Sequence, residues 1–89
     1  LLMIKGKTRT GFYYTITDET LDDWELLEIL RKIDDGNPHY LVDAAKKLLG
    51  DKQYTKLKNH IKKTVGRVSA TVMQKELDDI MQTNKKVKN

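Results

Sequence analysis

TLDDWELLEILRKIDDGNP, Thr20 to Pro38, is the stretch of sequence that decides the fold. Its apolar side chains recur every three or four positions, which is the spacing of one face of an α-helix. These apolar positions are Leu21, Trp24, Leu27, Leu30 and Ile33, with Leu26 and Ile29 widening the stripe. Thr20 is a suitable N-cap and Gly36 a suitable residue to end the helix. The pattern therefore predicts an amphipathic helix over about residues 20–34.

The same stretch concentrates the acidic side chains of the chain. Residues 18–35 contain eight acids and two bases, although the 89-residue chain has a formal net charge of +4. Acids in a first helical turn are stabilised by the helix dipole, but two or three would suffice for that. The surplus indicates either a surface for a basic or amphipathic partner, or acids that face the lysines of residues 52–64 within the chain.

Start and stop residues predict three more helices. Asn37 and Pro38 begin a helix over about 38–49, which Gly50 ends. A third helix over about 52–64 ends at Gly66. Ser69 caps a fourth over about 70–82.

Residues 3–17 are predicted to form a β-hairpin. MIKGK and GFYYTIT are two short runs on either side of a TRTG turn, and Phe12, Tyr14 and Ile16 alternate onto one face. Two strands alone are only marginally stable in water, so the hairpin must pack on helices or pair with another chain.

The predicted fold is therefore α+β, with an N-terminal β-hairpin packed on a bundle of about four short α-helices. We expect a single domain over residues 1–83, followed by a disordered basic segment over 84–89. Either Phe12 or Tyr13 is expected to be half exposed. The residues expected to be buried are Ile4, Tyr14, Ile16, Trp24, Leu27, Leu30, Leu48, Leu57, Ile61 and Leu77.

Composition argues against several functional classes. There is no cysteine, and no apolar run approaches the roughly 20 residues that span a bilayer. The early bases interrupt any signal-peptide core, so we expect a cytoplasmic protein without membrane association. The two histidines fall on different predicted helices and there is no glycine-rich phosphate loop. We therefore predict no catalytic residues, no cofactor and no metal site.

Two features have competing interpretations. Trp24 is either a core anchor, which its spacing favours, or an aromatic anchor at an interface. The lysine-rich third helix and the C-terminal segment could bind nucleic acid, with Tyr13 stacking on a base, but a solvated lysine face is favoured. The basic positions concerned are Lys52, Lys56, Lys58, Lys62, Lys63, Lys85, Lys86 and Lys88.

Three segments carry a resemblance to a known family. LDDWELLEILRKIDDGNP, LLGDKQYTKLKNHIK and GRVSATVMQKELDDIM together resemble a family of small tail-region proteins from phages and prophages of Gram-positive bacteria. That family is similar to the tail assembly chaperones of siphophages. The resemblance covers about residues 4–81, and the basic C-terminus departs from the family pattern.

The resemblance implies a non-enzymatic assembly factor. Such a chaperone binds the tape measure protein, recruits the major tail protein, works in the bacterial host cytoplasm and is absent from the mature virion. We assign the protein-binding surface to Asp22, Asp23, Trp24 and Glu25, with Tyr13 as a further candidate. The free edges of the hairpin also predict weak self-association at high concentration. A small nucleic-acid-binding phage regulator is the alternative function.

Overall fold

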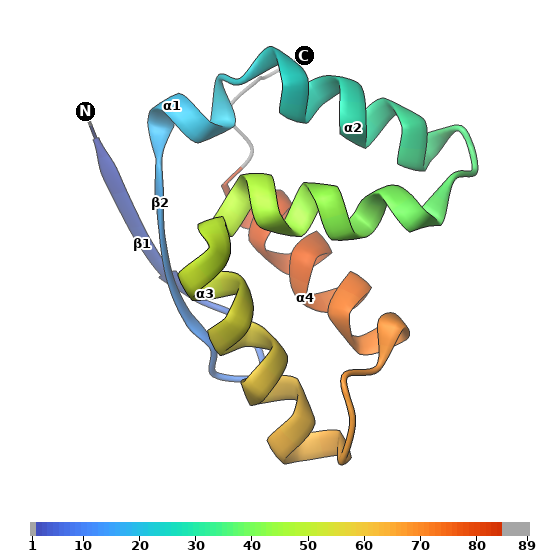
Figure 1. Ribbon diagram of the computed structural model, residues 1–89. Coiled ribbons are helices and arrows are strands. Elements are labelled where there is room, and N and C mark those ends of the chain that lie inside the picture. Colours follow the sequence, from blue (N-terminus) through green and yellow to red (C-terminus); the bar gives the residue numbers. More distant parts are fainter. Residues whose placement is uncertain (1, 85–89) are drawn as a thin grey trace.

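The chain begins with an antiparallel hairpin and continues in helices, as Figure 1 shows for the computed structural model. The structure describes residues 2–84. Strand β1 (Met3–Lys7) pairs with β2 (Tyr13–Thr17), and Lys5 lies opposite Thr15. Between the strands, the Thr8 N–H donates to the Phe12 carbonyl at 2.9 Å, and Gly11 supplies the positive φ of 94° that the turn requires. The predicted α+β fold is confirmed.

Alternation along β2 decides which face of the hairpin packs on the helices. Phe12, Tyr14 and Ile16 are buried, whereas the intervening Tyr13 is 74% exposed. The buried face joins one hydrophobic core with the helices, so the two-stranded ribbon is stabilised by packing rather than by its own hydrogen bonds.

The predicted helix over 20–34 is wrong in one respect, because it is two helices. α1 (Asp18–Leu21) and α2 (Trp24–Asp34) are separated by an extended Asp23 with φ −88° and ψ 119°. The Asp23 carboxylate accepts the Glu25 N–H at 2.8 Å, an N-cap bond that competes with helix continuation. Thr20 is therefore not the N-cap of the long helix. Thr17 caps α1 instead, by accepting the Thr20 N–H.

The second and third predicted helices are joined. A 3₁₀ turn, η1 (Pro38–Tyr40), leads into α3 (Leu41–Val65), which is kinked at Gly50, where φ 78° and ψ 164° are not helical. Gly50 thus interrupts the helix as expected, but the chain resumes its helical path at once rather than through a loop. In Figure 1 the two halves of α3 run in different directions from this point.

The last helix, α4 (Ala70–Thr83), agrees with the prediction to within one residue. The Ser69 hydroxyl accepts the Val72 N–H at 3.3 Å, which is the expected cap. Of the segment predicted to be disordered, 84–89, all but Asn84 lies outside the described residues. Within residues 2–84, no helix has both the length and the apolar character needed to cross a membrane.

The core contains most of the residues expected there. Ile4 and Leu30 are partly buried at its margin. Fully buried as expected are Tyr14, Ile16, Leu48, Leu57, Ile61 and Leu77. Trp24 and Leu27 contradict the prediction, being 71% and 57% exposed. α2 starts at Trp24 and packs on the core through Leu26, so the Trp24 and Leu27 side chains lie on the solvent-exposed side of the helix. The interpretation of Trp24 as a core anchor is therefore wrong.

Candidate protein-binding groove

A groove of about 490 Å³ lies between α2, the first half of α3 and the C-terminal half of α4. Its floor is apolar, with Leu26, Leu48 and Leu77 buried beneath it. The lining residues are Leu21, Asp22, Asp23, Trp24, Leu26, Leu27, Leu30, Ile33, Asp34, Leu41, Ala44, Leu48, Gln74, Leu77, Asp78, Met81, Gln82 and Asn84. The successive helices α2 and α3 and the sequence-distant α4 therefore build one hollow surface.

Two large apolar side chains stand exposed at this groove. Trp24 and Leu27 are on the first turn of α2, where the Asp23 cap fixes the start of the helix and hence the direction in which both side chains point. Both side chains also belong to the lining of the groove, and a largely apolar hollow with a few polar groups is a candidate binding site. The break between α1 and α2 is what presents it.

The polar residues of the groove are acidic or amide. Asp22, Asp23, Asp34 and Asp78 are in the lining, which includes no lysine or arginine among the described residues. The site therefore combines an apolar floor with a negative margin.

One lysine offsets part of that charge from outside the groove. Lys47 Nζ lies 2.8 Å from Glu25 Oε1 and 3.5 Å from Asp23 Oδ2. Desolvation acts to raise the pKa of Asp23, but the Glu25 N–H and the Lys47 ammonium outweigh it and lower that pKa below its ordinary value. The hydrogen bond to Glu25 raises the pKa of Lys47 in turn. Asp23 and Glu25 thus meet a lysine of the first half of α3, and not the lysines of residues 52–64.

The structure brings some of the predicted site residues together and separates others. Asp22, Asp23 and Trp24 line the groove, while Glu25 lies beside them on Lys47. Tyr13 lies elsewhere, on the exposed face of the hairpin, with Lys7 Nζ 5.5 Å from its ring centroid. The same Tyr13 borders a shallow recess with Lys56, Asn59 and Lys63 of α3.

Sequence reasoning missed the wall that α4 contributes. Leu77, Asp78, Met81 and Gln82 follow Trp24 by more than fifty positions. Periodicity shows that α4 has an apolar face, but it does not show which helix that face meets. Only the acid at Asp78 resembles the groove's other margin residues, and a lone acid carries no such signal.

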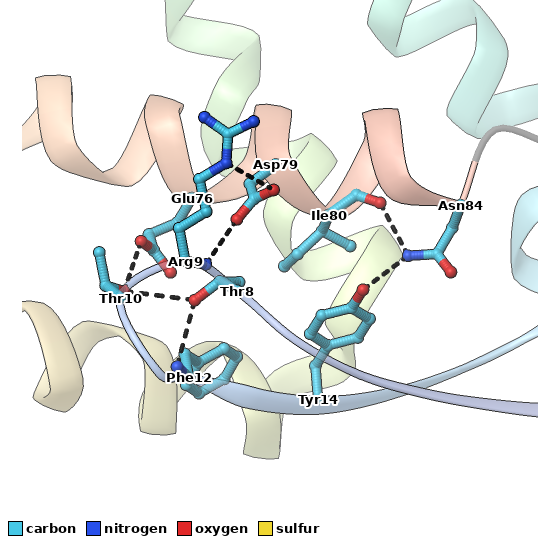
Figure 2. A network of polar contacts seen from close by, with 9 residues as sticks. All are labelled: Thr8, Arg9, Thr10, Phe12, Tyr14, Glu76, Asp79, Ile80 and Asn84. Atoms are coloured by element: carbon cyan, nitrogen blue, oxygen red, sulfur yellow. Dashed lines mark hydrogen bonds and ion pairs between the residues drawn. The ribbon is translucent and has the colours of Figure 1, made fainter.

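A polar network fixes α4, and therefore this wall, against the hairpin (Figure 2). The Thr10 hydroxyl donates to Glu76 Oε2 at 2.7 Å, and the Arg9 N–H donates to Asp79 Oδ2 at 2.8 Å. At the C-terminal end of the helix, Asn84 Nδ2 donates to the Tyr14 hydroxyl at 2.7 Å. These bonds fix the position of α4 along its own axis relative to the hairpin.

The described lining of the groove consists of apolar, acidic and amide side chains. No histidine or cysteine lines it, and nowhere in residues 2–84 do three histidine, cysteine, aspartate or glutamate side chains converge as a metal ion would need. Its shape and charge suit an apolar ligand with basic groups at its margins.

In comparisons with known proteins, no protein-family model, curated protein or solved structure matches the chain.

Proposed function

We propose that this protein is a non-enzymatic tail assembly chaperone whose groove binds a helical segment of the tape measure protein and so allows tail tube subunits to be recruited. The observation that carries the proposal is the apolar, acid-margined groove with Trp24 and Leu27 exposed on it. The resemblance of three segments to small phage tail-region proteins supports the tape measure protein as the partner.

The helical walls of the groove favour a helix as the ligand. Three helices bound it, and an amphipathic helix presents a ridge of side chains at i, i+3, i+4 and i+7 that can fill such a hollow. Trp24 supplies the kind of aromatic anchor that dominates binding energy at interfaces. A long helical tape measure protein offers such a ridge in many places.

Charge adds selectivity to this fit. A helix with lysine or arginine beside its apolar ridge would meet Asp22, Asp34 and Asp78, and complementary charge mainly accelerates encounter. An acidic helix of equal apolarity would be repelled. Binding should therefore weaken with salt without disappearing, since the apolar contacts remain.

Trp24 makes the proposal directly testable. It is the only tryptophan in the chain and is 71% exposed, so its emission reports on the groove. Titrating a tape measure fragment that itself lacks tryptophan should shift this emission to the blue as the indole leaves water. Leu27→Ser should weaken binding by about tenfold or more, the cost of one lost buried contact near a hot spot.

The matched control is Val68→Ser, because Val68 is also exposed but lies outside the groove. It should leave the affinity unchanged. Equal affinities for the Leu27 and Val68 variants, with both proteins folded, would count against the groove as the binding site.

A nucleic-acid-binding regulator is the second candidate. The recess that places Tyr13 beside Lys56 and Lys63 favours it, because single-stranded nucleic acid is held by aromatic stacking and lysine contacts. Its affinity would fall steeply with salt, and Lys56→Gln would weaken it while Leu27→Ser would not. A salt titration with both variants therefore distinguishes the two functions.

A further inference from the structure

We propose that the outer edge of β1 is a second interaction surface, which accepts an extended acidic segment of another protein as a third strand. Among residues 2–84 the sheet has two strands, and β1 is paired on one side only. In Figure 1, β2 lies between β1 and α3, so the unpaired edge of β1 is on the side away from the helices. No β1 residue lines the groove, so the two surfaces are separate.

The register shows which backbone groups face outward. A backbone hydrogen bond lies just beyond each end of the paired strands. The Asp18 N–H donates to the Leu2 carbonyl at 3.1 Å, and the Thr8 N–H donates to the Phe12 carbonyl at 2.9 Å. Antiparallel pairs alternate between bonded and non-bonded positions, so the even residues of β1 bond to β2. The N–H and C=O groups of Met3, Lys5 and Lys7 therefore point away from the hairpin.

The other edge of the sheet is closed by a side chain. Gln53 of α3 accepts the Thr15 N–H through Oε1 at 2.6 Å and donates from Nε2 to the Thr15 carbonyl at 2.6 Å. Its amide thus makes both bonds that a neighbouring strand would make to Thr15. Strand addition is consequently possible at β1 and obstructed at β2, and the position of these bonds opposite Lys5 agrees with the register.

Charge selects the occupant of the open edge. Lys5 and Lys7 are exposed on the solvent face of β1, and the first acid of the chain is Asp18. An added strand with acidic side chains on that face would form favourable cross-strand pairs. A second copy pairing antiparallel about Lys5 would place lysine against lysine, and edge lysines are a known means of preventing self-pairing.

The test uses the full chain labelled with ¹⁵N and a synthetic peptide of seven alternating glutamate and valine residues. Glutamate would then meet the solvent face and valine the packed face. On peptide addition, amide exchange at Lys5 and Lys7 should slow by about tenfold or more, because these groups gain partners. Exchange at Ile4 and Gly6, which already bond to β2, should change little.

Two variants at one position separate backbone from charge. Lys5→Pro removes an outward N–H without removing a β1–β2 bond, whereas Lys5→Thr removes the charge and keeps the N–H. Lys5→Pro should abolish peptide protection, and Lys5→Thr should only weaken binding. Leu27→Ser, which alters the groove, should bind the peptide normally. A negative result for strand addition at β1 is therefore distinct from a negative result for ligand binding in the groove.

Three results would overturn the proposal. One is unchanged exchange at Lys5 and Lys7 of the unmodified protein at saturating peptide, which requires no variant to fold. Another is equal protection by a lysine–valine peptide. The third is peptide-independent protection at these amides together with a dimer in sedimentation, which would make a second copy the occupant.

Discussion

At the scale of single residues, Thr10 is the junction between the hairpin turn and α4. Its hydroxyl donates to Glu76 Oε2 and lies 3.2 Å from the Thr8 hydroxyl and 3.0 Å from His60 Nε2. Glu76 is only 3% exposed, and its other oxygen, Oε1, has no hydrogen-bond partner within the described part of the chain. The Thr10 bond is therefore what compensates this carboxyl group for the loss of water.

Removing that hydroxyl should destabilise the protein. Thr10→Val leaves both Glu76 oxygens buried without a donor from the turn, and we expect a loss of about 1–3 kcal/mol in the free energy of unfolding. Urea denaturation measures it. Thr71→Val, at an exposed position of α4, is the control and should stay within about 0.5 kcal/mol of the parent.

A second substitution tests the cause. In Thr10→Val/Glu76→Leu neither polar partner remains, so much of the lost stability should return. A double variant that is less stable than Thr10→Val would show that Glu76 has another role in the core.

At the scale of elements, the kink in α3 is the feature that brings the groove and the hairpin into one molecule. Its first half bounds the groove through Leu41, Ala44 and Leu48, and its second half carries Leu57 and Ile61 into the core. Gly50 makes the change of direction, with a φ and ψ that other residues rarely adopt.

Gly50→Ala should therefore be costly although a methyl group has open space there. No atom lies within 4 Å of a Cβ built on Gly50, so the penalty would be conformational, about 1–3 kcal/mol. Thermal unfolding should show a lower melting temperature than the parent, whereas Lys46→Ala at an exposed position of the same helix should not. A Gly50→Ala protein of parental stability would indicate that α3 can straighten at no cost.

The ends of α3 and α4 at Gly66 and Ser69 could be predicted from the sequence. Ser69 and Gly66 act locally, through bonds to the adjacent turn, so their sequence signal survives in the folded chain. The division between α1 and α2 was missed because Asp23 suits both a helical first turn and an N-cap, and periodicity does not distinguish the two roles. Strand alternation gave the buried face of β2 correctly for the same local reason.

The groove was only half predictable. The acids and Trp24 stand out in the sequence because they cluster within four positions, but their relation to Met81 and Asp78 depends on how α4 packs. Spacing also placed Trp24 in the core, since a residue at a helix start can satisfy the periodicity and still lie beyond the neighbouring helix. Burial is a property of the packed assembly, and one helix does not determine it.

At the scale of the whole molecule, charge is divided between two surfaces. The groove margin and α2 are acidic, whereas the hairpin and the second half of α3 carry lysines. Lysines on the β1 edge disfavour pairing with the same edge of a second copy. Self-association should therefore proceed through the acidic surface of one molecule and the basic surface of another. Such contacts are weak and screened by salt.

We therefore expect weak oligomers at high protein concentration in low salt, which dissociate at about 0.5 M salt, where screening acts within a few ångströms. Sedimentation at both salt concentrations measures this. Asp22→Asn/Asp78→Asn should reduce the association, while the exposed and distant Asp51→Asn should not. Oligomers that persist equally in high salt would indicate an apolar interface instead.

The bonds that hold the hairpin against α4 also bear on how the chain folds while it is being synthesised. Thr10 finds Glu76 after 66 further residues, and Arg9 and Tyr14 find Asp79 and Asn84 after 70. A nascent hairpin thus emerges from the ribosome long before its anchors exist, with its apolar face uncovered and its strands marginal alone. The hairpin can therefore complete its packing only after the chain up to Asn84 has emerged, and until then any nascent-chain factor that acts on this protein has the uncovered face of Phe12, Tyr14 and Ile16 to recognise.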